Sequence, residues 1–129
     1  KLKVTTEKFK NTRITYHDPC YLGRANDIYD EPRRVIKSIA GDIAEMDRHK
    51  SFALCCGAGG AQMFKEAEKG DKEVFLERME DVLKVDPDIV ATACPFCMTM
   101  MTDGIKYKNQ EERMKNFDIA ELIAMSLGL

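Results

Sequence analysis

Five cysteines in three groups are the residues of this 129-residue sequence whose type and spacing point most directly to chemistry. Cys20 stands alone, Cys55 and Cys56 are adjacent, and Cys94 and Cys97 form a CxxC pair, so the complete pattern is C-x34-CC-x37-CxxC. Thiolates bind metal ions and exchange with disulfides. The pattern therefore indicates a metal site or a site of thiol redox chemistry.

The arrangement of these cysteines favours a site with more than one metal atom. The two sulfurs of a CxxC turn point the same way and can hold one metal, whereas adjacent cysteines normally diverge and contact different metal atoms. A structural zinc ion takes four ligands and would leave one of the five cysteines unused. An iron-sulfur cluster offers several iron atoms to thiolate ligands. The count favours iron, and zinc remains the alternative.

Composition and charge exclude several other classes of function. The formal net charge is -2, and the basic residues are scattered among acidic ones, so no basic surface for nucleic acid is expected. The uncharged stretch of residues 51–64, which no other stretch exceeds in length, is too short to cross a bilayer of roughly 30 Å. We therefore expect neither nucleic acid as a partner nor a direct membrane span.

The beginning of the sequence and the clustering of its cysteines both indicate the cellular compartment. The sequence opens on Lys1 without an initiator Met or an apolar signal core, which we interpret as an excised fragment of a cytoplasmic protein. In a reducing cytoplasm, clustered thiols more often bind metal or do redox chemistry than form disulfides.

Local patterns predict an alternation of strands and helices. Alternating β-branched residues, helical spacing of apolar residues, and Pro and Gly stops mark the element bounds. The capping box of Asp118 and Glu121 opens the last helix. We predict strands over residues 12–17, 43–46 (the weaker of the three) and 88–93, and helices over 32–40, 62–69 and 71–85 and from 119 onward.

This alternation predicts the architecture and the place of the site. Strands alternating with helices are typical of an α/β fold, here a small, mainly parallel sheet flanked by helices. In such sheets, ligands bind beyond the carboxyl ends of the strands. We place all three cysteine motifs on loops at those ends, in one domain spanning residues 1–129.

Three polar residues outside the cysteine set are candidates for a role at the site. His17 precedes Cys20 by three residues and could hydrogen-bond near a cluster and shift its potential, although a structural role is the more common fate. Arg24 could balance cluster charge or meet an anionic substrate. His49 stands among charged residues and is interpreted as solvent-exposed, and the charged run 66–80 as a solvated helix face.

The cysteine motifs, taken with their flanking residues, resemble a known family. The segments His17-Asp18-Pro19-Cys20-Tyr21-Leu22-Gly23-Arg24, Cys55-Cys56-Gly57-Ala58-Gly59-Gly60 and Ala93-Cys94-Pro95-Phe96-Cys97 are similar to the cysteine-rich CCG domain found in heterodisulfide reductase and in the iron-sulfur subunits of glycolate and lactate oxidases. The resemblance extends from about residue 13 to the C-terminus.

The resemblance implies a cofactor and partners. In characterised relatives, five cysteines hold a noncubane [4Fe-4S] cluster, which implies that role for Cys20, Cys55, Cys56, Cys94 and Cys97. Some copies of the domain bind zinc instead. The family implies electron transfer or disulfide reduction with flavin or ferredoxin-type subunits, some membrane-anchored, which would bring the protein to the inner face of the membrane.

We interpret the chain as the C-terminal CCG domain of a larger iron-sulfur oxidoreductase, inactive when isolated, with catalytic residues not assigned. The CCG-bearing polypeptide of heterodisulfide reductase carries two copies of the domain, so its two-cluster mechanism cannot be carried over to the one copy here. Two alternatives stay open. One is a structural zinc module that docks subunits, and the other is a cofactor-free dithiol oxidoreductase that uses Cys94 and Cys97 alone.

Overall fold

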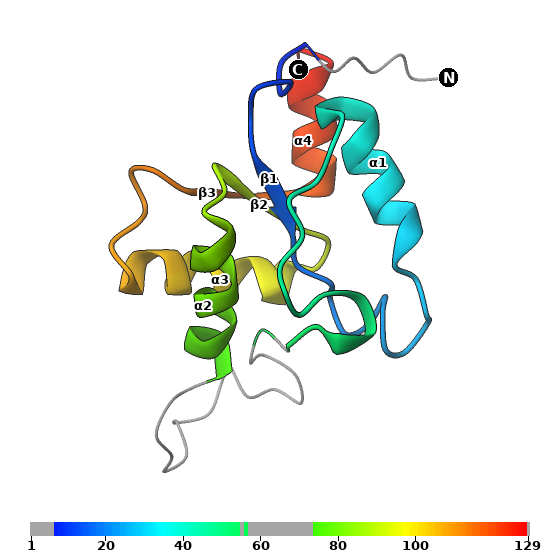
Figure 1. The fold of residues 1–129 in the computed structure, drawn as a ribbon. Coiled ribbons are helices and arrows are strands. Elements are labelled where there is room, and N and C mark those ends of the chain that lie inside the picture. Colours follow the sequence, from blue (N-terminus) through cyan, green and yellow to red (C-terminus); the bar gives the residue numbers. More distant parts are fainter. Residues whose placement is uncertain (1–6, 55, 57–73, 129) are drawn as a thin grey trace.

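A parallel sheet of three strands organises the part of the chain that the structure describes (Figure 1). The structure is a computed structural model that describes residues 7–54, 56 and 74–128. Its elements are β1 Ile14–Tyr16, α1 Asp30–Ala40, the 3-10 helix η1 Lys50–Phe52, α2 Val74–Val85, β2 Ile89–Thr92, α3 Pro95–Tyr107, β3 Lys115–Asp118 and α4 Ile119–Ser126. The helix predicted over residues 62–69 lies outside the described residues.

The central strand, β2, is buried on both faces. It pairs in parallel with β1 on one side, with Ile14 opposite Ile89, and with β3 on the other, with Ile89 opposite Lys115. All four residues of β2 are buried. Such burial explains the nearly continuous apolar sequence of this strand, which a helix-covered parallel strand requires.

Two separate cores cover the two faces of the sheet. On one face, Ile36 and Ile39 of α1 and Leu122 of α4 pack against apolar residues of β1 and β2. On the other face, Met79 and Val82 of α2 pack with residues of α3 and β2. Figure 1 shows α1 and α4 on one side of the sheet and α2 and α3 on the other. The predicted α/β fold with a small parallel sheet and flanking helices is confirmed.

The strand predicted over residues 43–46 is wrong, because this segment changes faces. It runs beside β1 with one backbone hydrogen bond, from the amide of Ala44 to the carbonyl of Ile14 (2.8 Å), and it adopts no strand. Ile43 packs against the core of α1 and α4, whereas Met46 is buried in the core of α2 and α3. Its apolar residues therefore reflect contact with both cores in turn.

Besides the short η1, two elements, α3 and β3, have no counterpart among the sequence predictions. β3 is the edge strand Lys-Asn-Phe-Asp, none of whose residues is fully buried, so it lacks the alternation that marks a half-buried strand. The side chain of Asn116 joins the two elements by donating to the carbonyl of Met98 (2.8 Å) and to the hydroxyl of Thr102 (3.0 Å).

Most other predicted bounds agree with the structure within about two residues, the usual scatter of helix and strand ends. α1 ends before Gly41, which has a φ of 82° that favours glycine. α2 ends at Val85, the predicted end, directly before the Asp86-Pro87 pair that stops a helix. Among the described residues, no helix is both long and apolar enough to cross a bilayer.

The predicted capping box at the start of α4 is present and gives a test of the fold. The Asp118 carboxylate accepts from the amide of Ala120 (2.8 Å), and Glu121 accepts from the amide of Asp118 (3.1 Å). We expect Asp118→Ala to lower the free energy of unfolding by about 1 kcal/mol, because a helix amide loses its acceptor. Urea unfolding followed by circular dichroism measures this. Glu112→Ala, at an exposed turn position, should change it by less than about 0.5 kcal/mol.

Candidate metal centre

The turn that follows β1 carries the first cysteine. Two backbone hydrogen bonds shape it, from the amide of Gly23 to the carbonyl of Pro19 (2.9 Å) and from Ala25 to Cys20 (3.1 Å). Gly23 is needed for close approach, since a Cβ there would lie 2.7 Å from the ring of Tyr29. The side chain of Cys20 is exposed on this turn, which leaves its thiol accessible.

A buried carboxylate fixes the turn to the rest of the chain. Asp18 accepts two hydrogen bonds from the guanidinium of Arg33, at 2.6 and 2.7 Å, and a third from the amide of Lys50 (2.7 Å). Arg33 also donates to Glu45 (2.8 Å). Burial alone lowers the pKa of Arg33, but its hydrogen bonds with Asp18 and Glu45 outweigh that effect and raise it. The Arg33 guanidinium therefore keeps its positive charge although it is buried.

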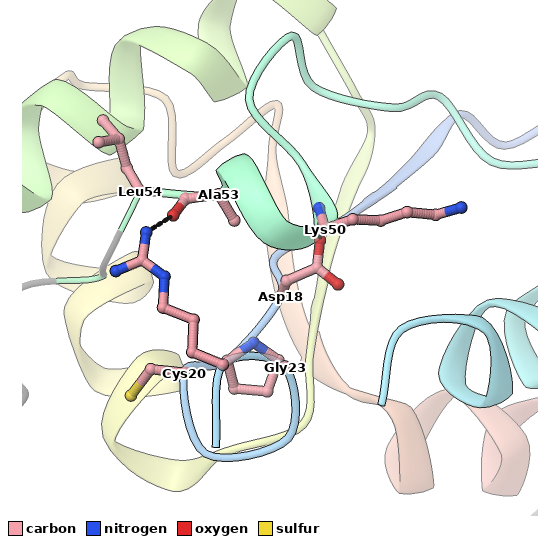
Figure 2. Close-up of a pocket in the computed structure, with 8 residues that line it drawn as sticks. Asp18, Cys20, Gly23, Lys50, Ala53 and Leu54 are labelled. Atoms are coloured by element: carbon pink, nitrogen blue, oxygen red, sulfur yellow. Dashed lines mark hydrogen bonds between the residues drawn. The ribbon is translucent and has the colours of Figure 1, made fainter. Parts of the chain in front are cut away.

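A second link joins this turn to the segment that leads into Cys55 and Cys56. The guanidinium of Arg24 donates to the carbonyl of Ala53 (2.6 Å). A small pocket lies at this junction, and Figure 2 shows Cys20 and Gly23 on one side of it, with Ala53 and Leu54 on the other. Arg24 thus has a backbone partner that holds the first and second cysteine segments together.

The third cysteine group spans the end of β2 and the start of α3. Cys94 is the N-cap of α3 and is half-buried, Pro95 is the first helical residue, and Cys97 is buried in the first turn. This group thus begins in the turn after β2, as predicted, but its second cysteine belongs to α3, a helix that was not predicted from the sequence. The two sulfurs thus lie at the N-terminal, positive end of the α3 dipole.

Two of the cysteines meet a histidine in the interior. A ring nitrogen of His17 and the Sγ atoms of Cys56 and Cys97 all lie within 4.8 Å of one another, and all three residues are buried. They come from the end of β1, the segment before α2 and the start of α3. Such a set of donors from three distant segments can hold a metal.

A buried arginine supports this donor group from α2. Arg78 is fully buried, and its Nε donates to Nδ1 of His17 (3.0 Å). Its Nη1 donates to the carbonyl of Arg48 (2.6 Å) and to Asp81 (3.2 Å). Asp81, also buried, binds Arg48 in addition, at 2.8 and 2.9 Å. A buried charge of this kind is costly unless it is paired, and Asp81 provides the pairing.

The surroundings keep His17 neutral. The pKa of His17 is lowered to about 3, first by burial and second by the neighbouring charge of Arg78, while Asp18 opposes the change. The charge of Arg78 beside the cysteine group compensates negative charge, which thiolates and sulfides carry.

The structure thus brings together only some of the predicted site residues. Cys56 and Cys97 lie in one buried group, Cys94 lies one helical turn from Cys97, and Cys20 lies on the exposed turn that lines the pocket. Cys55 lies outside the described residues. His49 is half-exposed, and its ring nitrogen Nδ1 lies 2.6 Å from the carbonyl oxygen of Met46, away from this group.

Three buried charged residues at the site are not among the residues predicted from the sequence, namely Arg33, Arg78 and Asp81. The assignment of residues 66–80 to a solvated face is wrong at Arg78, because this side chain is fully buried and donates to His17. A signal was present in the sequence, since Arg78 and Asp81 are three residues apart, directly before the apolar Met79 and Val82.

The fold and the site together define a cysteine-rich α/β domain, with thiols beyond the carboxyl ends of paired parallel strands. Residues 14–102 match the CCG family of cysteine-rich domains, and the chain belongs to that family. The resemblance seen in the sequence motifs is confirmed. No solved structure matches the chain.

Curated relatives fall among redox proteins. The chain is 44% identical over 115 residues to "Probable iron-sulfur-binding oxidoreductase FadF" of Bacillus subtilis, covering 88% of the chain and 16% of the relative. It is 41% identical over 127 residues to EtfAB:quinone oxidoreductase of Syntrophomonas wolfei (94% and 18%). It is 42% identical over 130 residues to one of the subunits of dihydromethanophenazine:CoB–CoM heterodisulfide reductase of Methanosarcina barkeri (98% and 31%). The chain thus spans less than a third of each of these relatives.

The buried pair of Arg33 and Asp18 gives a test of how the first cysteine turn is held. We expect Arg33→Leu to lower the free energy of unfolding by about 3 kcal/mol, because the buried Asp18 carboxylate loses its charged partner. Urea unfolding measures the loss. The exposed neighbour Arg34 is the matched control, and Arg34→Leu should cost less than about 0.5 kcal/mol. Equal losses in the two variants would contradict the assignment.

Proposed function

We propose that this chain binds an iron-sulfur cluster through Cys20, Cys55, Cys56, Cys94 and Cys97 and serves electron transfer or disulfide reduction. The observation that carries the proposal is the buried group of Cys56, Cys97 and His17, whose donor atoms lie within 4.8 Å of one another. Sulfur and imidazole are the donor types that metals bind in proteins, and here they come together from three separate segments.

The residues at the site fit a cluster in charge as well as in donor type. Thiolates and sulfides carry negative charge, and Arg78 places a buried positive charge one histidine ring away from the cysteines. The Nη2 atom of Arg78 has no hydrogen-bond partner among the described residues, so one buried donor is left for an acceptor that a cofactor would supply.

The cluster type that we propose is the noncubane [4Fe-4S] form. The family resemblance and the number of cysteines support it, because the adjacent Cys55 and Cys56 suit a cofactor with several metal atoms. When bound, such a cofactor would accept and release electrons. The chain would contribute thiolate ligands, burial and hydrogen bonds that set the potential.

Two considerations support a partner for this chain. The relatives are more than three times as long as the chain, and disulfide reduction needs two electrons. Reduction of a disulfide takes two electrons, so a domain that passes single electrons needs a donor that supplies them in turn. We propose that this donor is another subunit or domain of a larger oxidoreductase, of flavin or ferredoxin type and in some assemblies membrane-anchored. We also propose the cytoplasm as its compartment, because clustered thiols there stay reduced.

A zinc site is the second candidate, and one observation favours it. The group of His17, Cys56 and Cys97 contains the ligand types of a structural zinc ion, and Cys94 lies close by in sequence. Such a module would serve to dock subunits. It differs from the cluster in metal, in sulfide content and in the number of cysteines that it needs.

Metal analysis after anaerobic reconstitution tests the proposal. We expect about four irons with matching sulfide per chain, as the cluster type requires. We also expect Cys56→Ala and Cys97→Ala to lower bound iron at least about ten-fold, in line with the loss of ligands. The exposed Thr99, whose hydroxyl donates to the carbonyl of Pro95, gives a matched control. Thr99→Ala should keep wild-type iron.

The other outcomes identify the alternatives. One tightly held zinc ion without iron, and one single-cysteine variant that remains fully metallated, would indicate the zinc module. Disulfide reductase activity without any metal, lost only in variants of Cys94 and Cys97, would indicate the dithiol oxidoreductase. Either result would remove the proposal of a cluster.

A further inference from the structure

His17 lies between Arg78 and the cysteine group, which consists of Cys56 and Cys97. Its two ring nitrogens have different partners. We propose that His17 is a positioning residue, which donates a hydrogen bond from Nε2 to a sulfur atom of the cysteine group. Its contact with Arg78 prevents it from acting as a metal ligand. The inference rests on the proposed function and adds the role of a residue outside the five cysteines.

The contact with Arg78 fixes the position of the histidine proton. The Nε of arginine always carries hydrogen and cannot accept a hydrogen bond. Because it lies 3.0 Å from Nδ1 of His17, Nδ1 must accept. An imidazole whose Nδ1 accepts a hydrogen bond is in its neutral form, which carries a single ring proton. The single ring proton is therefore on Nε2.

This tautomer leaves no lone pair on Nε2 for a metal. Coordination through Nε2 would move the proton to Nδ1, where it would face the N–H of Arg78. Coordination through Nδ1 would break the hydrogen bond and leave the Nε of a fully buried arginine without an acceptor. Although the histidine has the type and position of a metal ligand, its partner makes it a donor.

Arg78 cannot easily turn away to release the histidine. Its Nη1 is bound to the carbonyl of Arg48 (2.6 Å) and to Asp81 (3.2 Å), which itself is bound to Arg48. The guanidinium is planar, so these bonds also fix the direction of its Nε–H. Three residues thus hold the ring of His17 in one orientation, namely Arg48 from the segment before η1 and Arg78 and Asp81 of α2.

A hydrogen bond to sulfur has a defined effect on reduction. The reduced state carries more negative charge on sulfur, so a donor stabilises it more than the oxidised state. His17 is therefore expected to raise the reduction potential without being needed for iron binding. A ligand would show the opposite pattern, with loss of metal when it is replaced.

The first experiment uses the unsubstituted chain, reconstituted anaerobically with ¹⁵N-labelled histidine. The sequence holds two histidines, and His49→Gln assigns the signal to His17. Pulsed EPR of the paramagnetic redox state should show a weak ¹⁵N coupling and an exchangeable proton that is lost in deuterated buffer. A strong coupling, as a nitrogen bound directly to iron gives, would overturn the inference, and so would the absence of any coupling.

The second experiment compares substitutions that keep or remove the donor. His17→Phe should keep the iron content and lower the equilibrium constant for reduction about ten-fold, which is about 59 mV in midpoint potential for a one-electron couple. His17→Gln retains an N–H donor and should stay within about three-fold of wild type, as should His49→Gln. Unchanged potentials in all variants, or loss of iron in His17→Gln, would overturn the inference.

The outcomes separate this inference from the proposed function. A wild-type chain that takes up no iron would remove both. Iron uptake with a histidine that is bound to it, or with potentials that do not respond to His17, would remove only the inference. If His17→Phe does not fold, the labelled wild-type chain and His17→Gln still decide the matter.

Discussion

The buried charge pair of Asp18 and Arg33 is the interaction on which the arrangement of the site depends. Asp18 is two residues from Cys20, and its carboxylate also accepts from the amide of Lys50, a residue that begins η1. One carboxylate thus joins the first cysteine turn, helix α1 and the segment that leads to the second cysteine pair. Because both partners are buried, the loss of either would leave a costly unpaired charge.

The end of β1 is bound by one arginine from each helix layer. Successive side chains of a strand point to opposite faces. Asp18 accordingly meets Arg33 of α1, while His17 meets Arg78 of α2. The same four-residue segment, His17 to Cys20, therefore carries a ligand candidate and is fixed from both sides of the sheet. This explains how a short strand of three residues can present a cysteine at a defined place.

The sequence predicted well the apolar elements of this fold and the element ends marked by stop or capping residues. It predicted poorly the elements of mixed polarity and the buried polar side chains. Local chemistry determines the continuous apolar run of β2, the Gly41 stop of α1 and the capping box at Asp118. Each of these features can therefore be predicted from neighbouring residues. The edge strand β3 and the buried Arg78 depend on distant partners that no local pattern records. The five cysteines were found from spacing, but the proximity of Cys56 and Cys97 needed the fold.

The segment of residues 42–46 links the two cores of the domain in a way that bears on cooperativity. Ile43 packs in one core, Met46 is buried in the other, and only two residues separate them along the chain. If either core opened locally, this segment would be pulled from its place and would expose apolar surface of the other core. The two layers are therefore expected to unfold together as one unit, with little population of states in which α1 and α4 are lost alone.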